Sequence, residues 1–512
     1  MEKKLVSILA LIILTALIFA LMLPKSTPAS GDTVQSEPEE ETAPPAPTPP
    51  PPVSEEPPAK EEPEEPPAER VLSTYFGNIT AEDTFEDNGQ FERYEKTYTY
   101  FDGDVFCSGR IVVPEEQPAL YHVSKLSLEG SAGTVRYYDG AKWITAPLEE
   151  ASLTSGMYFI NTELEQMIVC LPFAYRPLEN SVLQEIEGFE PKMLIKNKDG
   201  AWSFEIYAPK TETGAYIEYM YVISSGELID WSRSDAAADW AGYLFTGKSR
   251  WTYDGYYYTA PHNYIPTGDG CFHSLSAAYI STKFIDRSSD YRAARIMGLA
   301  MLDMMCALQN EMGYFPTEAG SQWLLDDYDV GPGFFDTRFN TDLVTAMITA
   351  ITELGAEWLR PCVDNFFTFY MNWLDTSANE RNGAILAPDY WDADGCKVTH
   401  TSLNHQLAEA LMVLRMFRLT GEEIYLEKAL ALTAGVTAKT EFWLSGPGGD
   451  LQYGYYAGSP IGSDYPYLTY NDLYMLNNEL YLVTGHRDAD LDRMMAHKLV
   501  WMVKNRVTGY IK

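Results

Sequence analysis

The second half of the chain carries a helical pattern that repeats about every 66 residues. Four leucines mark equivalent positions, separated by 68, 64 and 66 residues: Leu275, Leu343, Leu407 and Leu473. A turn follows 12–14 residues after each leucine, and in three copies it contains a glycine: Gly355, Gly421 and Gly485. A second helix is expected after each turn. The pattern predicts at least four helix hairpins, with part of a fifth ending near residues 253–258.

Repeated helix hairpins form either an open solenoid or a closed ring. Ordinary helical solenoids have repeats of about 34–47 residues with short loops. Here each copy has a long loop rich in aromatic residues and glycine, and long loops in compact domains usually carry function. We therefore expect residues 227–512 to form a ring, an α/α toroid of about four to five hairpins. The first helices of its hairpins run parallel, so the loops before them open onto one mouth.

These loops hold a high density of polar and aromatic side chains, including four of the seven histidines. We predict the catalytic residues to be Asp342, Asp389, Asp392 and His405. We predict the substrate-binding residues to be Tyr264, His262, His273, Arg338, Trp391, Asn404, Tyr470 and Asn471. Several of these positions would also serve as helix caps, and Asp336 could pair with Arg338 in a purely structural salt bridge.

The four loop histidines raise the alternative of a metal site. The spacing of His262, His273, His400 and His405 fits no metal-ligand motif, so we expect neither a metal nor a cofactor.

Residues 71–226 have the pattern of an antiparallel β domain. Turn dipeptides at 102–103, 139–140 and 199–200 separate stretches rich in β-branched and aromatic residues. We expect a sandwich or a barrel-like sheet there, without a compact catalytic motif.

The first 70 residues predict location rather than fold. Residues 1–4 would be a cytoplasmic stub, and the apolar run from Leu5 to Leu23 is just long enough to cross a bilayer. We expect an uncleaved transmembrane signal-anchor because no good cleavage site follows it; a cleaved signal peptide is the alternative. Residues 24–70 are rich in proline and glutamate, which predicts a disordered stalk that holds the rest of the chain outside the cell membrane.

The net charge of −36 and the pI near 4.5 exclude nucleic acid as a partner, because phosphate binding needs a basic surface. The six cysteines show neither metal-ligand spacing nor the density of a disulfide scaffold.

The segment "LTGEEIYLEKALAL" and the repeats that end in Gly-Tyr resemble the helical hairpins of α/α-toroid carbohydrate-active enzymes, such as the six-hairpin glycosidases. A β domain followed by four hairpins also resembles the layout of the glucuronyl C5-epimerases. The resemblance covers residues 227–512 and is architectural. It implies a polysaccharide or oligosaccharide substrate and supplies no catalytic residues.

The leading hypothesis is a membrane-tethered glycoside hydrolase, which needs one protonated and one ionised carboxyl group across a sugar cleft. We expect Asp342 to be ionised, His405 to be neutral, and the proton donor to be Asp389 or Asp392, desolvated against Tyr390 and Trp391. One alternative is a uronic-acid C5-epimerase or polysaccharide lyase, with Tyr264 or His405 as base and Arg338 as cation. Another is a non-catalytic glycan-binding envelope protein. Convergence of the candidate acids and His405 in one cleft would favour an enzyme.

Overall fold

The computed structural model describes residues 69–154, 156–244 and 247–511. The predicted signal-anchor and nearly all of the predicted stalk lie outside these ranges. Among the described residues, no helix has the length and apolar character needed to cross a membrane. The six cysteines all lie in the described part of the chain, and each is a free thiol.

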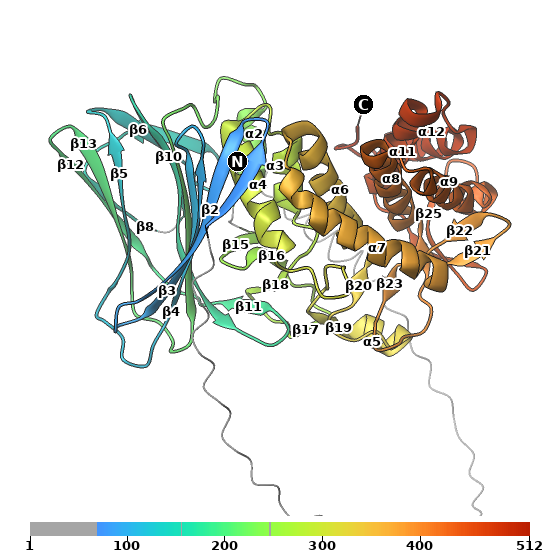
Figure 1. The fold of residues 1–512 in the computed structure, drawn as a ribbon, viewed down its shortest axis with the longest axis horizontal. Coiled ribbons are helices and arrows are strands. Elements are labelled where there is room, and N and C mark those ends of the chain that lie inside the picture. The colour runs from blue at the N-terminus through green and yellow to red at the C-terminus, as the bar shows by residue number, and fades with distance from the viewer. Residues whose placement is uncertain (1–68, 155, 245–246, 512) are drawn as a thin grey trace, which may run out of the picture. The chain divides into compact units, whose positions relative to one another are not determined.

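Two antiparallel sheets stack in the first half of the chain (Figure 1). The larger follows the order β1-β2-β3-β4-β14-β10-β11-β18-β16-β15, with β9, β6 and β7 branching from β10, and the smaller follows β5-β13-β12-β8. The strands of the larger sheet are β1 (Arg70–Thr74), β2 (Gly77–Asp87), β3 (Glu92–Tyr100), β4 (Val105–Val112), β6 (Gly133–Tyr138), β7 (Trp143–Pro147), β9 (Met157–Thr162), β10 (Gln166–Pro177), β11 (Val182–Glu185), β14 (Tyr216–Ser224), β15 (Ser249–Thr252), β16 (Gly255–Thr259) and β18 (Cys271–Ser274). Those of the smaller sheet are β5 (Tyr121–Glu129), β8 (Ala151–Thr154), β12 (Lys192–Lys198) and β13 (Ala201–Ala208).

The larger sheet is buried on both faces, which explains the apolar runs in its central strands. In β10, Val169 and Leu171 face the core between the two sheets. Ile168 and Cys170 alternate with them and face the core shared with the helices. The β domain therefore packs directly on the helical region.

Four helix hairpins follow the sheets (Figure 1). They are α3 (Tyr279–Asp286) with α4 (Arg292–Cys306), α6 (Thr337–Leu354) with α7 (Arg360–Ser377), α8 (Leu403–Thr420) with α9 (Glu423–Thr437), and α11 (Leu468–Thr484) with α12 (Ala489–Lys504). The shorter helices are α2 (Ala236–Tyr243), α5 (Gln322–Tyr328), α10 (Thr440–Trp443) and the 3-10 turn η1 (Glu357–Leu359). Among the first helices, α6 contacts α3 and α8, and α8 contacts α11. This confirms the predicted fold class, an antiparallel β domain followed by the hairpins of an α/α toroid.

The predicted turns end three of the first helices. Gly355, Gly421 and Gly485 have φ of 71°, 75° and 79°, a left-handed conformation that glycine adopts without strain.

The first repeat departs from the prediction. Leu275 lies between β18 and α3, so the helix of this copy begins four residues after it. Residues 253–258, predicted to end a partial hairpin, instead form the turn and most of β16 in the large sheet. The tyrosine-rich sequence there is equally suited to a strand.

Five short strand pairings tie the loops between the hairpins together. Their strands are β17 (Tyr264–Ile265), β19 (Gly320–Ser321), β20 (Phe335–Asp336), β21 (Asn379–Arg381), β22 (Ala384–Leu386), β23 (Tyr390–Trp391), β24 (Thr401–Ser402), β25 (Gln452–Tyr456) and β26 (Ser459–Ser463).

Candidate functional site

A two-residue strand pair sets which side chains enter the mouth. In the pairing of β20 with β23, Asp336 lies opposite Tyr390 and Phe335 lies opposite Trp391. Paired residues share a face of a sheet, and successive residues alternate between faces. Asp336 and Tyr390 therefore point to one side and Trp391 to the other.

Asp389 is the centre of a buried polar cluster and is 0% exposed. Its Oδ1 accepts a hydrogen bond from the backbone N–H of Ser402 at 2.7 Å. Its Oδ2 lies 3.2 Å from Nε2 of His400, without hydrogen-bond alignment, and 3.8 Å from Nδ1 of His405. Burial opposes the charge, but His405 and His400 together hold the pKa of Asp389 below its ordinary value. A lowered pKa favours an ionised Asp389 and does not favour the predicted role of proton donor.

His405 lies in the first turn of α8 and contacts the first residue of α6. Its Nδ1 is 2.8 Å from Oγ1 of Thr337, so the two helix N-termini are adjacent, as predicted. Burial lowers the pKa of His405 to about 4, against the opposing effect of Asp389, so the ring is neutral at pH 7. A proton on Nδ1 would face both Thr337 and the Asp389 carboxylate. Nε2 has no hydrogen-bond partner among the described residues. In this tautomer its lone pair can therefore accept a proton, as a general base does.

Asp336 is the N-cap of α6. Its Oδ1 accepts a hydrogen bond from the N–H of Phe339 at 3.0 Å, and the residue is only 4% exposed. Burial raises the pKa of Asp336 to about 7; the Phe339 N–H opposes this shift and the charge of Asp389 adds to it. Asp336 can therefore hold a proton near neutral pH, which is the property required of a general acid.

Arg338 joins three of the first helices. It donates hydrogen bonds to the Asp342 carboxylate at 3.0 Å, to the Asp472 carboxylate at 2.7 Å and to the backbone oxygen of Asn404 at 3.1 Å. The structural pair expected between Arg338 and Asp336 is therefore replaced by pairs with Asp342 and Asp472. Two carboxylates already balance this guanidinium charge.

A cavity of about 210 Å³ extends from this arginine between the four first helices. Residues of all four line it: Thr282 and Asp286 of α3, Arg338, Asp342, Thr345, Ala346 and Thr349 of α6, Ala408, Leu411 and Arg415 of α8, and Asp472 and Met475 of α11. The side chain of Asp342 is 26% exposed, so it is the accessible carboxylate of the arginine cluster.

The structure links three of the four predicted catalytic residues. Arg338 donates hydrogen bonds both to the Asp342 carboxylate and to the backbone oxygen of Asn404. The next residue in the chain, His405, has its Nδ1 3.8 Å from Oδ2 of Asp389. Asp392 is held elsewhere, because its carboxylate accepts hydrogen bonds from the N–H groups of Gly331 at 2.7 Å and Asp394 at 3.0 Å. These bonds hold the Asp392 carboxylate against the loop backbone, apart from the Asp389 cluster.

The predicted binding residues divide between the mouth and other surfaces. Burial, and to a smaller extent the charge of Asp336, raise the pKa of Tyr264. The Tyr264 ring lies 4.9 Å from the ring of His273 in β18. The Tyr470 ring packs on Tyr510 at 5.5 Å, and Asn471 accepts a hydrogen bond from Ile511 N–H at 2.9 Å, so both face the C-terminal segment.

The remaining predicted binding residues differ in exposure. His262 lies on the surface. Burial lowers the pKa of His273 to about 4. Trp391 borders a separate groove of about 340 Å³, together with Phe369 and Trp373.

The sequence indicated Tyr390 only as an apolar neighbour of the predicted acids, and it did not indicate Glu409. The ring of Tyr390 lies 5.8 Å from those of both His400 and His405. Glu409 is 0% exposed, accepts a hydrogen bond from Tyr370 at 2.7 Å, and burial raises its pKa to about 8. The spacing of four residues from His405 could have indicated Glu409, because that spacing places both on one face of α8.

No group of three or more His, Cys, Asp or Glu residues in the described ranges could hold a metal ion. No family model matches the chain, and none of the curated proteins does.

Several solved structures share part of the fold. A D-mannose isomerase is 13% identical and a cellobiose 2-epimerase from Spirochaeta thermophila is 12% identical, each with a TM-score of 0.34 over 45% of this chain. The chain spans about three fifths of the length of these two proteins, 61% and 58%. A family 76 glycoside hydrolase from a bovine Bacteroides thetaiotaomicron strain is 10% identical, with a TM-score of 0.35 over 83% of this chain and 77% of its own. These proteins are of the kind that the sequence resemblance indicated, but similarity at this level assigns no activity to the chain.

Proposed function

We propose that this chain is a carbohydrate-active enzyme, and that it is a glycoside hydrolase acting on a neutral polysaccharide. The observation that carries the proposal is Asp336, a buried carboxyl group whose pKa is raised to about 7 at the mouth of the toroid. Glycoside hydrolysis needs one carboxyl group that carries a proton and a second group that is ready to accept one.

The roles follow from the environments of the side chains. Asp336 donates its proton to the glycosidic oxygen. His405, neutral and oriented by Asp389 and Thr337, accepts a proton from the attacking water at Nε2. Asp342, the accessible carboxylate that lines the cavity, stabilises the positive charge that develops on the sugar ring.

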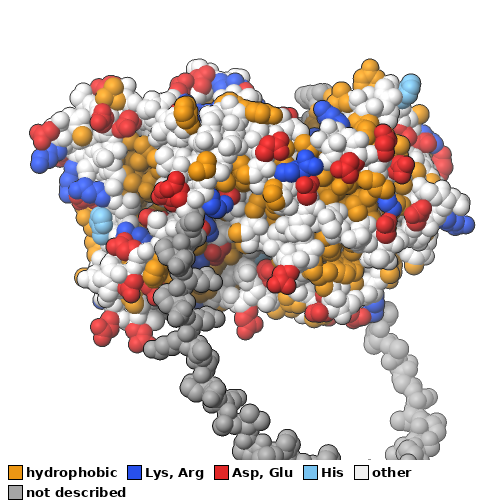
Figure 2. All heavy atoms as spheres, viewed as in Figure 1, with side chains coloured by type: hydrophobic (Ala, Val, Ile, Leu, Met, Phe, Trp, Pro, Cys, Tyr) orange, Lys and Arg blue, Asp and Glu red, His pale blue; other side chains and the backbone are white. Residues whose placement is uncertain are grey.

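The charges around the mouth favour a neutral substrate. Arg338 is paired with two carboxylates and has no free charge for a substrate acid. Figure 2 shows Asp and Glu side chains spread over the visible face, in keeping with the net charge of −36. Such a surface repels a polyanion at low salt.

A screen of polysaccharides tests this proposal. The full chain should release reducing ends from at least one neutral polysaccharide and should not produce absorbance at 235 nm from polyuronates. Unsaturated products from a polyuronate would contradict the hydrolase proposal. Binding without turnover would favour a glycan-binding protein.

A uronic-acid epimerase or lyase is the second candidate. The neutral His405, with no protein partner at Nε2, is also the base that abstraction of a C5 proton requires. The paired state of Arg338 counts against it, because the substrate carboxylate would have to displace Asp342 or Asp472.

We also propose that the enzyme is tethered to the cell membrane through Leu5–Leu23, with the catalytic part outside the cytoplasm. The support is the 19-residue apolar run after Lys3 and Lys4. The full chain should remain in the membrane fraction after carbonate washing. Recovery of a soluble chain that starts near Ser30 would contradict this.

A further inference from the structure

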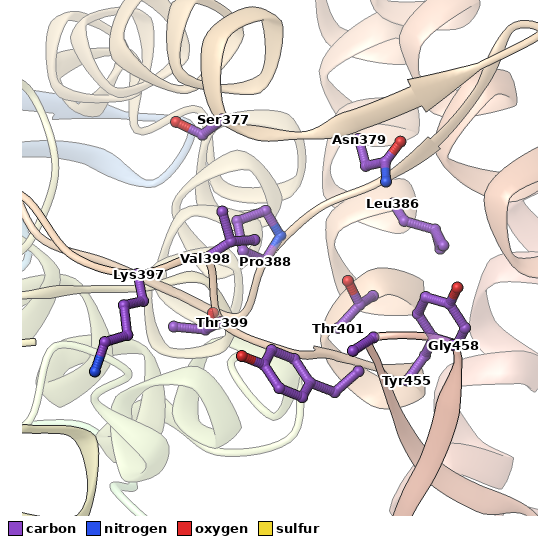
Figure 3. Close-up of a pocket in the computed structure, with 12 residues that line it drawn as sticks. Ser377, Asn379, Leu386, Pro388, Lys397, Val398, Thr399, Thr401, Tyr455 and Gly458 are labelled. Atoms are coloured by element: carbon purple, nitrogen blue, oxygen red, sulfur yellow. The ribbon is translucent and has the colours of Figure 1, made fainter. Parts of the chain in front are cut away.

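A second cavity, of about 490 Å³, is lined in part by the chain neighbours of Asp389 and His400, namely Pro388, Thr399 and Thr401 (Figure 3). Three segments line it: the end of α7 with β21, β22 and Pro388, residues 397–399 with Thr401, and the hairpin of β25 and β26. Figure 3 shows Lys397 at one end, and Asn379, Leu386 and Tyr455 at the other. Its volume lies within the range of about 300–1,000 Å³ that is usual for small-molecule sites.

Strands β24 and β25 contribute residues to both this cavity and the Asp389 cluster. In the pairing of β24 with β25, Thr401 lies opposite Tyr455, and both border the cavity. The same two strands also reach the Asp389 cluster: the Ser402 N–H of β24 donates to Asp389, and the Tyr453 ring of β25 lies 5.9 Å from the ring of His400. The strands that position the candidate site therefore also build the cavity.

The lining offers aromatic faces and uncharged polar groups. Tyr455 and Tyr456 both border the cavity, and Tyr456 is 39% exposed. The side chains of Ser377 and Asn379 have no hydrogen-bond partner among the described residues. Lys397, the only charged residue in the lining, already pairs with Asp329 at 3.0 Å.

We propose that this cavity is a second saccharide-binding subsite, which holds a neutral sugar of the glycan away from Asp336. Aromatic rings beside hydroxyl and amide groups match the apolar faces and the hydroxyl rim of a sugar. The choice of a neutral saccharide as ligand rests on the proposed function. The position of the subsite follows from the cavity itself.

Isothermal titration of the full chain carrying Asp336→Asn tests the subsite without turnover. The probes are maltohexaose, cellohexaose, xylohexaose and mannohexaose. At least one should bind. Tyr456→Ala and Asn379→Ala, each added to this background, should weaken that binding about 3- to 10-fold, the scale of an aromatic contact or a hydrogen bond. Tyr456→Phe should keep most of the affinity.

Tyr481→Ala is the matched control, since Tyr481 is 56% exposed on α11 and does not line the cavity. The Tyr456 ring contacts Tyr328, whose ring contacts His400, so Tyr456→Ala could disturb the Asp389 cluster indirectly. Asn379 makes no such ring contact, so Asn379→Ala avoids this effect. Unchanged affinity in both test variants overturns the subsite, and so does failure of every hexasaccharide to bind. Binding that depends on Tyr456 in a chain that hydrolyses none of the four would overturn the proposed function and support the subsite.

Discussion

Asp336 and Asp389 lie side by side and have opposite pKa shifts. The N–H of Thr337, next to Asp336, donates to the backbone oxygen of Asp389 at 3.0 Å. Asp389 has two imidazoles and a backbone N–H beside its carboxylate, whereas Asp336 has backbone N–H groups and the repulsion of Asp389. Neighbouring groups of one residue type thus differ in charge: Asp336 can hold a proton, whereas the Asp389 carboxylate orients His405.

Replacement of the candidate base should abolish most of the turnover. His405→Ala is expected to lower kcat about 10²-fold or more, the usual scale for a positioned base, with the far-UV spectrum unchanged. His486→Ala, at an exposed histidine just after α11 and outside the candidate site, is the control and should retain full activity. Near-full activity of both variants would restrict His405 to a structural role.

Stability should fall as the pH rises from 6.5 to 8. Folded Asp336 and Glu409 have pKa values of about 7 and 8, whereas unfolded carboxyl groups release their protons near pH 4, so the folded state binds more protons in this window. His405 and His273, with folded pKa values of about 4 and unfolded values near 6.5, add most of their stability as the pH rises from 4 to 6.5 and only about 0.4 kcal/mol each above it. The free energy of unfolding should therefore fall by about 2 kcal/mol over this window.

Glu409→Gln tests the origin of that fall, because glutamine keeps an acceptor for Tyr370 and cannot ionise. Urea unfolding at pH 6.5 and pH 8 should show a decline smaller by about 1.5 kcal/mol in the variant. Glu427→Gln, at an exposed position of α9, should behave like the wild type. A decline of the same size in all three proteins would contradict the assignment to Glu409.

At the scale of elements, the register of β23 divides its two aromatic residues between different surroundings. Tyr390 faces the histidines, while Trp391 packs near Phe369, with ring centroids 5.9 Å apart. The sequence placed Trp391 in the acidic loop correctly but could not predict which way it points. The direction depends on a two-residue pairing with β20, a segment more than 50 residues away in the chain.

Trp391→Ala should therefore lower stability. Loss of this half-buried ring is expected to cost about 2 kcal/mol, less than the 3–5 kcal/mol of a fully buried aromatic side chain. Urea unfolding measures it, with Tyr481→Ala as the control, since Tyr481 is 56% exposed on α11. An unchanged midpoint for Trp391→Ala would show that the ring is free to bind a ligand.

The repeat in the sequence located the helices well where local signals agree. The glycine turns and the aligned leucines fall within or directly after α6, α8 and α11. The first copy failed because the segment before α3 completes the large sheet, and strand pairing there overrides the helical pattern. For the site, the repeat brought the right loops together. It could not show that Asp336 is the carboxyl group with the raised pKa, because the burial of Asp336 and its distance from Asp389 depend on the assembled ring.

At the scale of the whole molecule, the acidic surface and the paired arginine predict a neutral substrate. Hydrolysis of a neutral polysaccharide should change less than about 2-fold between 50 and 500 mM NaCl, because no charged substrate is steered and screening has little to act on. Initial rates at subsaturating substrate measure this. A rate that falls steeply with salt would indicate a charged glycan.

The most direct test of the account is the reducing-end release by Asp336→Asn on a neutral polysaccharide that the wild type hydrolyses. Asparagine keeps the size of the side chain and an oxygen that accepts from Phe339 N–H, but its amide cannot transfer a proton to the leaving group. The variant should lose about 10²-fold or more in kcat and should still unfold cooperatively. Retention of near-wild-type kcat by a folded Asp336→Asn chain would contradict it.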